Sequence, residues 1–408
     1  MKKKKDEELM NTLRESLLRF IRWLDANGYA SYDHYDLWAS EYGIFSRRVF
    51  AKNKLIGIPL VGSLQLVDMF FPYVRKFVAK KAISAEAMPY FAIGFFRLFE
   101  LYGEEEYLRK GVRCLEWLKE NSVKTASGIG WGLHFDWENK EFIPKGTACV
   151  TLTAYSQDAF LYGYKLLKDK TYLDMATGIA EFVYRDLNKK IISSDTVAVS
   201  YTPICGMFVA NANSYAAKIL YDAGEITGKT EYMNLGRKIV NYILSQQNKD
   251  GSWYYWDRSA KDNFIDSFHT AFILENLFNV FEKDHDPAVR EAIFKGYNFY
   301  KEKFLDNSPF CRHYHVYKVP TGIKVDTRSQ AEAIYCLSVL SDVIPEAREK
   351  ALSIASWTIK HMQNKKGFFY FRKFRTHTVK MPYMRWAEAP MFNALTYLLC
   401  KFKNLKTD

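Results

Sequence analysis

Two residues in the segment DSFHTAFILENL have the types and the spacing of an acid–base pair. Asp266 and His269 are three residues apart, so a helix through this segment would place both on one face, one turn apart. A carboxylate beside an imidazole can orient the ring and move a proton to or from a substrate. Two structural roles compete, because Asp266 can cap the helix and His269 can be a hydrogen-bonded core residue. We predict both as catalytic candidates.

Three more carboxylates stand beside basic or aromatic residues. Asp136 follows His134 by two residues in GIGWGLHFDW, and side chains two apart project to the same face of an extended strip. Asp326 lies in VDTRSQAEA and Glu388 in MRWAEAPMF, each near an arginine. Two carboxylates in different environments can divide the acid and base roles of glycosidic bond cleavage. We predict all three as catalytic candidates, with helix capping as the competing role, above all for Asp326.

Aromatic and polar residues near these carboxylates are candidates for substrate binding. Tryptophan and tyrosine rings can stack against sugars, and a guanidinium can hold a sugar carboxylate in a forked geometry. The same rings can instead belong to the core, and the arginines can instead neutralise buried acids. The predicted substrate-binding residues are Trp131, His134, Tyr201, Asn211, Trp253, Arg328, Arg385 and Trp386.

A repeat must position these residues. Segments rich in small or apolar residues recur about every sixty residues. They begin near Pro89, Thr151, Ala210, Asp266, Asp326 and Trp386. Between them lie segments such as TEYMNLGRKIVNYILSQQ, which read as helices with one polar and one apolar face. Common helical solenoids repeat every 34 to 47 residues or so, which is too short for this period. We therefore predict an all-α fold, an (α/α)6 toroid of helical hairpins with short aromatic β-strips at one end.

The domain organisation follows from the same pattern. No Pro-, Ser- or Gly-rich linker divides the 408 residues, so residues 28–408 are predicted to form a single toroid. Residues 1–27 are predicted to be a charged tail and an amphipathic helix that packs on the ring. The crowded segment GYASYDHYDLWAS, residues 28–40, either covers the mouth of the ring or forms a surface turn. A ring would bring the starts of its inner helices, and with them the candidate residues, to one cavity.

Residues 55–74 are the most apolar run of the chain, and four basic residues follow within the next seven positions. A span of about 20 apolar residues can cross a bilayer, but prolines and Asp68 interrupt this run. Two alternatives remain. The run either lies at a membrane interface as a basic, aromatic-rich apolar element, or it packs against the outer ring.

Charge and cysteine content limit the partners. The net charge of +12 favours an acidic partner. No nucleic-acid-binding motif is recognised, so nucleic acid is not expected as the partner. We expect an anionic oligosaccharide or polysaccharide, or a phospholipid surface. The six cysteines form no CxxC pair, and neither a metal nor a cofactor is predicted. Dispersed cysteines and an N-terminus, MKKKKDEELM, without an apolar signal segment indicate a cytoplasmic protein, with the inner membrane surface as an alternative location.

The helix-pair period, the QQNKDGSW turn, the DSFHTAFILENL helix and the MRWAEAPMF segment together resemble the six-hairpin toroids of carbohydrate-active proteins. More narrowly, the chain from residue 28 to 402 resembles proteins of polysaccharide assembly related to the helical domain of glucuronyl C5-epimerases. The resemblance implies action on a uronate-containing glycan by hydrolysis, elimination or epimerisation at C5. It assigns no catalytic residue, because the functional tyrosines and glutamate of the epimerases have no residue-by-residue match here. The DxDD motif of terpene cyclases and the Cys/Cys/His zinc set of lanthionine-cyclase-like toroids are not found.

We therefore expect a carbohydrate-active enzyme that acts on a uronate-containing or other anionic glycan, by C5 epimerisation or by glycosidic bond cleavage. The alternative is a non-catalytic glycan-binding or scaffold subunit of a membrane-associated polysaccharide assembly complex. Such a subunit would keep the aromatic platform and tolerate loss of the acids.

Overall fold

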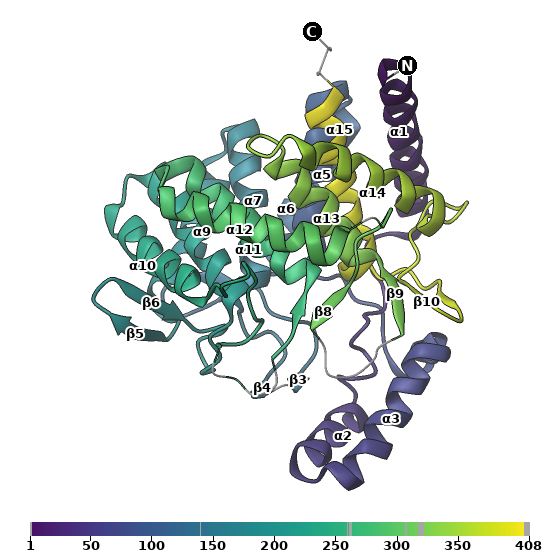
Figure 1. Ribbon diagram of the computed structural model, residues 1–408, viewed down its shortest axis with the longest axis horizontal. Helices are drawn as coiled ribbons and strands as arrows, with labels where there is room; N and C mark the ends of the chain where they lie inside the picture. The colour runs from purple at the N-terminus through teal and green to yellow at the C-terminus, as the bar shows by residue number, and fades with distance from the viewer. Residues whose placement is uncertain are drawn as a thin grey trace.

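The computed structural model describes residues 2–138, 140–258, 260, 263–306, 308–316 and 322–403. Six helices form the inner layer of a ring (Figure 1). They are α5 (Ala87–Tyr102), α7 (Val150–Leu167), α9 (Ala210–Thr227), α11 (Ser267–Asp284), α13 (Thr327–Leu340) and α15 (Ala389–Lys403). Each packs against the next, and α15 packs against α5, so the ring closes. The predicted (α/α)6 toroid is confirmed.

The outer layer is built from the amphipathic helices. It contains α6 (Glu105–Glu120), α8 (Lys170–Glu181), α10 (Thr230–Gln246), α12 (Pro287–Tyr300) and α14 (Glu346–Met362), each packed on the inner helix that precedes it. Helix α1 (Lys2–Asn27) packs on α14 and α15 and takes the sixth outer position. The division of the chain at residues 27 and 28 stays a prediction. Three π-helical segments continue or precede these helices, namely η2 (Phe182–Asp186), η3 (Lys301–Leu305) and η4 (Met384–Glu388).

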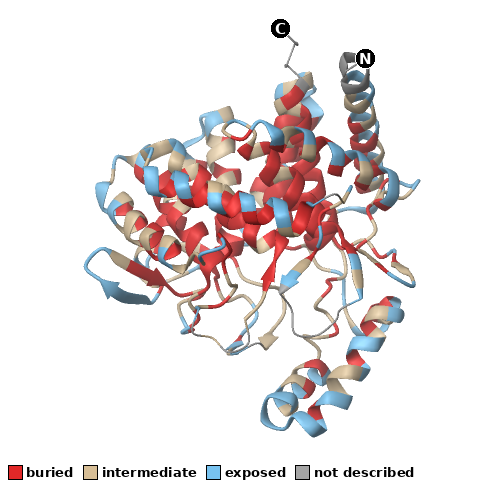
Figure 2. Ribbon diagram, in the orientation of Figure 1, coloured by how far each residue is buried: buried red, intermediate tan, exposed pale blue. Residues whose placement is uncertain are grey.

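The two helix layers differ in burial because they differ in sequence. The inner helices are buried on nearly every side, since neighbours and outer helices cover them (Figure 2). Small residues allow the close approach: a Cβ on Gly236 of α10 would lie 2.9 Å from the ring of Tyr221 on α9. The outer helix α10 buries one stripe, made of Tyr232, Gly236, Ile239, Val240, Tyr242 and Ile243. This spacing is the period of a one-sided helix.

Short antiparallel strand pairs lie where the inner helices begin. They are β1 (Val123–Lys124) with β2 (Ile129–Gly130), β3 (Trp137–Glu138) with β4 (Phe142–Ile143), β5 (Lys189–Ser193) with β6 (Thr196–Val199), and β7 (Ile265–Asp266) with β8 (Tyr314–Val316). A three-stranded sheet has the order β11 (Thr378–Val379), β10 (Arg372–Phe374), β9 (Ile323–Asp326). Strands β7 and β9 lead directly into α11 and α13, so their last residues, Asp266 and Asp326, become helix caps.

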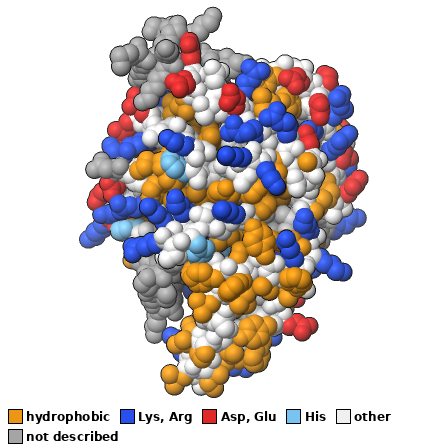
Figure 3. Space-filling view, turned by 90° about the vertical axis from the view of Figure 1, so that its right-hand side faces the viewer, with side chains coloured by type: hydrophobic (Ala, Val, Ile, Leu, Met, Phe, Trp, Pro, Cys, Tyr) orange, Lys and Arg blue, Asp and Glu red, His pale blue; other side chains and the backbone are white. Residues whose placement is uncertain are grey.

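One part of the chain stands away from the ring. It comprises α2 (Glu41–Lys52), α3 (Lys54–Phe70), η1 (Pro72–Val74) and α4 (Arg75–Val78), and it projects from the strand end of the toroid (Figures 1 and 3). Its apolar side chains face outward, with Leu55 85% and Phe77 88% exposed, so the run does not pack into the outer ring. None of the described helices is by itself long and apolar enough to cross a membrane. Helix α3 and the following η1–α4 pass that test only as a pair, bent by 96°.

Candidate active site

Asp266 and His269 form a hydrogen-bonded pair at the start of α11. Asp266 Oδ2 lies 2.7 Å from His269 Nδ1, and Oδ1 accepts a hydrogen bond of 2.9 Å from the backbone N–H of His269. The carboxylate therefore caps the helix and binds the imidazole at the same time. Because a carboxylate can only accept, Nδ1 carries the proton of the neutral imidazole and Nε2 is its basic nitrogen. No hydrogen bond joins Nε2 to any of the described residues, and the side chain is 21% exposed.

A small hollow of about 10 Å³, room for one water molecule, lies against this pair. The Tyr255 ring forms one wall, with its centroid 4.5 Å from that of the His269 ring. Asn211 is 5% exposed, and its Oδ1 has no hydrogen-bond partner within the described part of the chain. The remaining lining residues are Trp253, Tyr254, Phe264, Ile265, Asp266, Thr270 and Ile273. The hollow thus joins an acid–base pair, an aromatic wall and an unpaired amide oxygen.

Residues 28–40 cover the mouth of the ring, which was one of the two roles considered for them. Asp33 is held by Arg385, whose Nε and Nη2 donate to its two carboxylate oxygens at 2.6 and 2.7 Å. The His34 ring lies 4.8 Å from that of Phe371 and 5.5 Å from that of Trp386. Burial alone would raise the pKa of Asp33, but the Arg385 guanidinium holds it below its usual value. Burial, with Arg372 nearby, lowers the pKa of His34 well below its ordinary range.

Arg385 and Arg328, both predicted to bind substrate, lie together and are joined by a buried glutamate. Glu86 Oε2 accepts from Arg385 at 3.0 Å, and Glu86 Oε1 accepts from Arg328 at 2.8 Å. Arg328 Nη2 also donates to the hydroxyls of Tyr90 and Tyr155 at 3.2 and 3.3 Å. In this structure both guanidiniums are therefore engaged by acids of the chain itself.

Two of the predicted carboxylates, Asp326 and Glu388, lie in the core. Asp326 forms an ion pair with Arg372 and accepts a hydrogen bond of 3.2 Å from the Ser329 backbone N–H. Glu388 lies in η4, where its two oxygens accept from the Phe369 N–H at 3.1 and 3.0 Å. Burial raises the pKa of Glu388 well above its ordinary value, and the hydrogen bond from the Phe369 N–H opposes this shift. Both residues therefore hold strands and helices together.

Two of the three tryptophans predicted to stack on sugar occupy equivalent core positions. The Trp131 indole N–H donates to the Leu118 carbonyl at the end of α6, and the Trp253 N–H donates to the Ile243 carbonyl of α10, both at 3.0 Å. Each is at most 2% exposed, although Trp253 also borders the small hollow. Trp386, in contrast, lies under the mouth segment, with its ring 5.8 Å from that of Phe268.

The other predicted residues lie in loops of the same end. Asp136 accepts a hydrogen bond of 2.7 Å from the Lys145 backbone N–H. His134 is half-buried, and its ring lies 4.8 Å from that of Phe135. The Tyr201 hydroxyl is 2.7 Å from the Thr151 hydroxyl. The structure therefore brings Asp266, His269, Asn211 and Trp253 to one hollow. A second group, Arg328, Arg385 and Trp386, lies at the mouth, with His134 close enough to Asp33 and Arg385 to interact electrostatically. Trp131, Asp136, Tyr201, Asp326 and Glu388 do not line that hollow.

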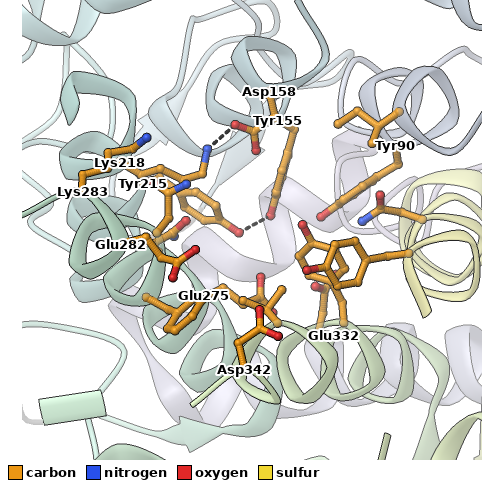
Figure 4. A pocket seen from close by; sticks show the side chains of 18 residues that line it. Tyr90, Tyr155, Asp158, Tyr215, Lys218, Glu275, Glu282, Lys283, Glu332 and Asp342 are labelled. Carbon is orange, nitrogen blue, oxygen red and sulfur yellow. Dashed lines mark hydrogen bonds and ion pairs between the residues drawn. The ribbon is translucent and has the colours of Figure 1, made fainter. Parts of the chain in front are cut away.

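Sequence reasoning missed a second polar space inside the ring. A cavity of about 300 Å³ is lined by tyrosines and acids of the inner helices, and Figure 4 shows Tyr90, Tyr155 and Tyr215 pointing into it. The Tyr155 and Tyr215 hydroxyls are 2.6 Å apart, and Lys218 pairs with Asp158. Both contacts join residues that are sixty positions apart. Because this is the repeat period, comparing equivalent positions of consecutive inner helices in the sequence would have indicated these pairs.

The cations that line this central cavity are paired, but Glu275 Oε1 and Asn279 Oδ1 are buried without a hydrogen-bond partner among the described residues. Burial raises the pKa of Glu332 to about 7, while Arg328 Nε, 2.7 Å away, opposes the shift. Burial also raises the pKa of Glu275 well above its ordinary value, and Glu332 adds to this effect. Within the described residues, no cluster of three or more His, Cys, Asp or Glu side chains is placed to hold a metal ion.

Comparison with known proteins identifies the class at the level of fold. No protein-family model matches the chain, and no curated protein matches it. Among solved structures, it is similar to a cellobiose 2-epimerase from Bacillus thermoamylovorans, with a TM-score of 0.63 and 11% identity over 79% of this chain and 88% of the other. It is also similar to an unsaturated glucuronyl hydrolase specific for heparin, with a TM-score of 0.56 and 15% identity over 76% and 85% of the two chains.

A sugar epimerase from a ruminal bacterium gives a TM-score of 0.60 and 12% identity over 79% of this chain and 88% of that one. Identities this low show the fold alone. The predicted resemblance to (α/α)6 toroids of carbohydrate-active proteins is thereby confirmed, whereas the reaction has to be argued from the site.

Proposed function

We propose that the chain is a carbohydrate-active enzyme whose acid–base pair is Asp266 and His269. The observation that carries the proposal is the 2.7 Å contact between Asp266 Oδ2 and His269 Nδ1, next to a hollow with aromatic walls. The similarity in fold to sugar epimerases and to a glucuronyl hydrolase supports a carbohydrate as the substrate class. The net charge of +12 supports an anionic glycan, such as one that contains uronate.

We assign each group a role from its position. His269 Nε2 takes a proton from the substrate, and Asp266 stabilises the imidazolium that forms. The unpaired Oδ1 of Asn211 accepts from a sugar hydroxyl, and Tyr255 packs against the ring. If the proton comes from C5 of a uronate, a water molecule delivers a different proton to the opposite face of the C5 carbanion, and His269 passes the abstracted proton to solvent, which completes an epimerisation. If it comes from a water that attacks the anomeric carbon, the bond from that carbon to the glycosidic oxygen breaks and the leaving oxygen takes a proton from solvent, so the glycosidic bond is hydrolysed. Both reactions begin from the same base.

The central cavity is the weaker candidate for the reacting centre. Its cationic groups are paired, Lys218 with Asp158 and Arg328 with Glu332, whereas Nε2 of His269 has no partner among the described residues. A proton-transfer group must be within reach of the substrate and not occupied by the protein. His269 at the start of α11 meets the second condition, and its side chain is 21% exposed.

The reaction is tested by incubating the full chain with defined uronate oligosaccharides in deuterated water. Deuterium at C5 without chain cleavage indicates epimerisation, new reducing ends indicate hydrolysis, and an unsaturated product indicates elimination. Binding without any of the three would contradict the enzyme proposal.

A non-catalytic glycan-binding subunit is the second candidate, and one observation favours it. Asp33 is bound to Arg385 and His34 packs on Trp386, and the hollow beside His269 has room for only one water molecule. In that case, sugar binding would survive replacement of both Asp266 and His269. The cytoplasmic location and the absence of a nucleic-acid partner stay predictions, and membrane contact is a separate proposal about α2–α4.

A further inference from the structure

Residues 41–81, which we call the elbow, hold most of the exposed apolar surface of the protein. Twelve of the eighteen large hydrophobic side chains that are exposed among the described residues lie between Tyr42 and Val78. They are Tyr42, Phe45, Phe50, Leu55, Ile56, Ile58, Leu66, Phe70, Phe71, Tyr73, Phe77 and Val78. Figure 3 shows hydrophobic side chains gathered on this projection. Soluble proteins seldom expose contiguous apolar patches of this kind without a partner for them.

The elbow is also strongly basic. Its 41 residues contain eight lysines and arginines but two acids, so it carries +6, half of the net charge of the chain. Asp68 and Arg75 form a buried ion pair and cancel, so the seven other basic residues and Glu41 still give +6. Lys52, Lys54, Lys76, Lys80 and Lys81 are all exposed. Lysines beside exposed aromatic and aliphatic side chains are the composition of elements that lie in the interface of an anionic bilayer.

The elbow is firmly attached, so its exposure is not the result of a loose segment. Arg75 is fully buried, and it donates to the Asp33 and His34 carbonyls at 3.0 and 2.8 Å. The Trp38 indole N–H donates to Asp68 at 3.1 Å. His377 Nε2 lies 2.8 Å from the Met69 carbonyl, which ties the end of α3 to the β10–β11 hairpin. The ring thus presents the apolar surface in a fixed orientation.

The shape favours an element that lies on a membrane over one that crosses it. Helix α3 alone does not meet the length and composition of a span, and the 96° bend after it turns η1–α4 away from its axis. A bent pair can place Leu55 at one end and Phe77 at the other in the same apolar layer, with the lysines at the level of the headgroups.

We propose that the elbow docks on an anionic lipid surface through these apolar side chains. A second copy of the chain fits less well, because a two-fold contact would set one +6 surface against another. The elbow projects from the same end of the toroid as the strand pairs that precede the inner helices (Figure 1). Docking would therefore turn the Asp266–His269 end toward the membrane. The substrate would then be a glycan held at a membrane, for example on a lipid anchor. This statement about the substrate rests on the proposed function, whereas the docking itself does not.

Vesicle flotation of the full chain tests the docking without any measurement of catalysis. We expect the protein to float with vesicles of phosphatidylglycerol and phosphatidylethanolamine, about tenfold or more above its flotation with phosphatidylcholine alone, and to be released by high salt. The variant Leu55→Ser/Phe77→Ser should lower binding at least about tenfold, since each side chain loses its apolar burial. Lys76→Gln/Lys80→Gln should lower binding several-fold on anionic vesicles only.

The toroid supplies a matched control. Ile191 and Ile204 are 77% and 59% exposed but lie outside the elbow, so Ile191→Ser/Ile204→Ser should bind vesicles like the wild type. Circular dichroism confirms that each variant is folded. The proposal is wrong if the wild type does not float with anionic vesicles, or if the control variant loses as much binding as the elbow variant. It is equally wrong if the elbow substitutions convert a dimer into a monomer or release a bound protein while vesicle binding is unaffected.

Discussion

Arg385 binds both carboxylate oxygens of Asp33, at 2.6 and 2.7 Å, although 352 residues separate the two in the chain. Neither residue is more than 5% exposed. A guanidinium fork on a carboxylate is strong and directional, so this pair fixes the mouth segment over the start of α15. The pair therefore joins residues 28–40 to the segment that leads into α15.

Asp33→Asn should lower the free energy of unfolding by about 3–5 kcal/mol, because it removes one partner of a buried ion pair and leaves Arg385 with Glu86 only. Urea denaturation followed by circular dichroism measures the change. Asp36→Asn is the matched control in the same segment. Burial raises the pKa of Asp36 to about 7, and the asparagine side chain resembles the neutral form of this carboxyl group. We therefore expect Asp36→Asn to change the free energy of unfolding by about 1 kcal/mol or less.

The same pair predicts a pH dependence. Arg385 lowers the pKa of Asp33 in the folded state despite burial, whereas an unfolded aspartate titrates near 3.9 or so. The stabilisation is therefore complete above about pH 4 and is lost as the pH falls toward the folded pKa, because the unfolded state binds the proton first. The difference in unfolding free energy between wild type and Asp33→Asn should stay constant from neutral pH to about pH 5 and shrink below about pH 4. A difference that does not shrink in acid would exclude Asp33 as the titrating group.

Replacing either member of the Asp266–His269 pair should abolish most turnover without unfolding the protein. Asp266→Asn and His269→Gln should each lower kcat by roughly 10²- to 10⁴-fold, the usual contribution of a general base. Asn caps a helix about as well as Asp, so the stability of Asp266→Asn should change by about 1 kcal/mol or less. Asp136→Asn is the comparison, since among the described residues that carboxylate accepts a hydrogen bond from a loop amide, and it is a rival candidate. Full activity in Asp266→Asn, or a loss as large in Asp136→Asn, would reassign the acid–base role.

The features that depend on local spacing could be predicted from the sequence. The sixty-residue period predicted the alternation of inner and outer helices. Asp266 and Asp326 cap α11 and α13, as expected for an Asp directly before a helical segment. The apolar face of the first helix follows from Leu13, Leu17 and Phe20, which recur at helical spacing and are at most 2% exposed. In each case a few neighbouring residues contain the whole signal.

The features that depend on ring closure could not be predicted. Glu86 sits between Arg328 and Arg385 only because α5 lies beside α15, and nothing near Glu86 in the sequence marks it as their partner. The inward direction of Tyr155 and Tyr215, and hence the central cavity, requires the relative rotation of two helices. The sequence likewise does not distinguish a tryptophan that stacks on sugar from Trp131, whose indole binds the carbonyl of a neighbouring helix.

Glu388→Gln should stabilise the protein at alkaline pH but not in acid. Burial raises the folded pKa of Glu388 well above the value of about 4.3 that a glutamate has when unfolded. The contribution of Glu388 to the free energy of unfolding is complete below about pH 4.3. It falls by about 1.4 kcal/mol per pH unit as the pH rises from there to the folded pKa. Glutamine retains the acceptor for the Phe369 N–H and does not titrate, so its advantage over the wild type should grow with pH in denaturation experiments. Asp326→Asn should show the opposite sign at neutral pH, because Arg372 holds the folded pKa of Asp326 low against the effect of burial.

Helix α1 should be an integral part of the ring and not a removable tail. The Phe20 ring is 1% exposed and lies 5.4 Å from Phe392 of α15 and 6.3 Å from Phe369, centroid to centroid. Phe20→Ala should therefore cost about 3–5 kcal/mol of unfolding free energy, the usual cost of a large cavity in a packed core. Leu18→Ala lies on the same helix with its side chain 38% exposed, and its cost should be about 1 kcal/mol or less. Urea denaturation of both variants compares the two faces of α1 directly. If Phe20→Ala were as stable as Leu18→Ala, residues 1–27 would be an appendage, and the closed outer layer would need only the five helices from α6 to α14.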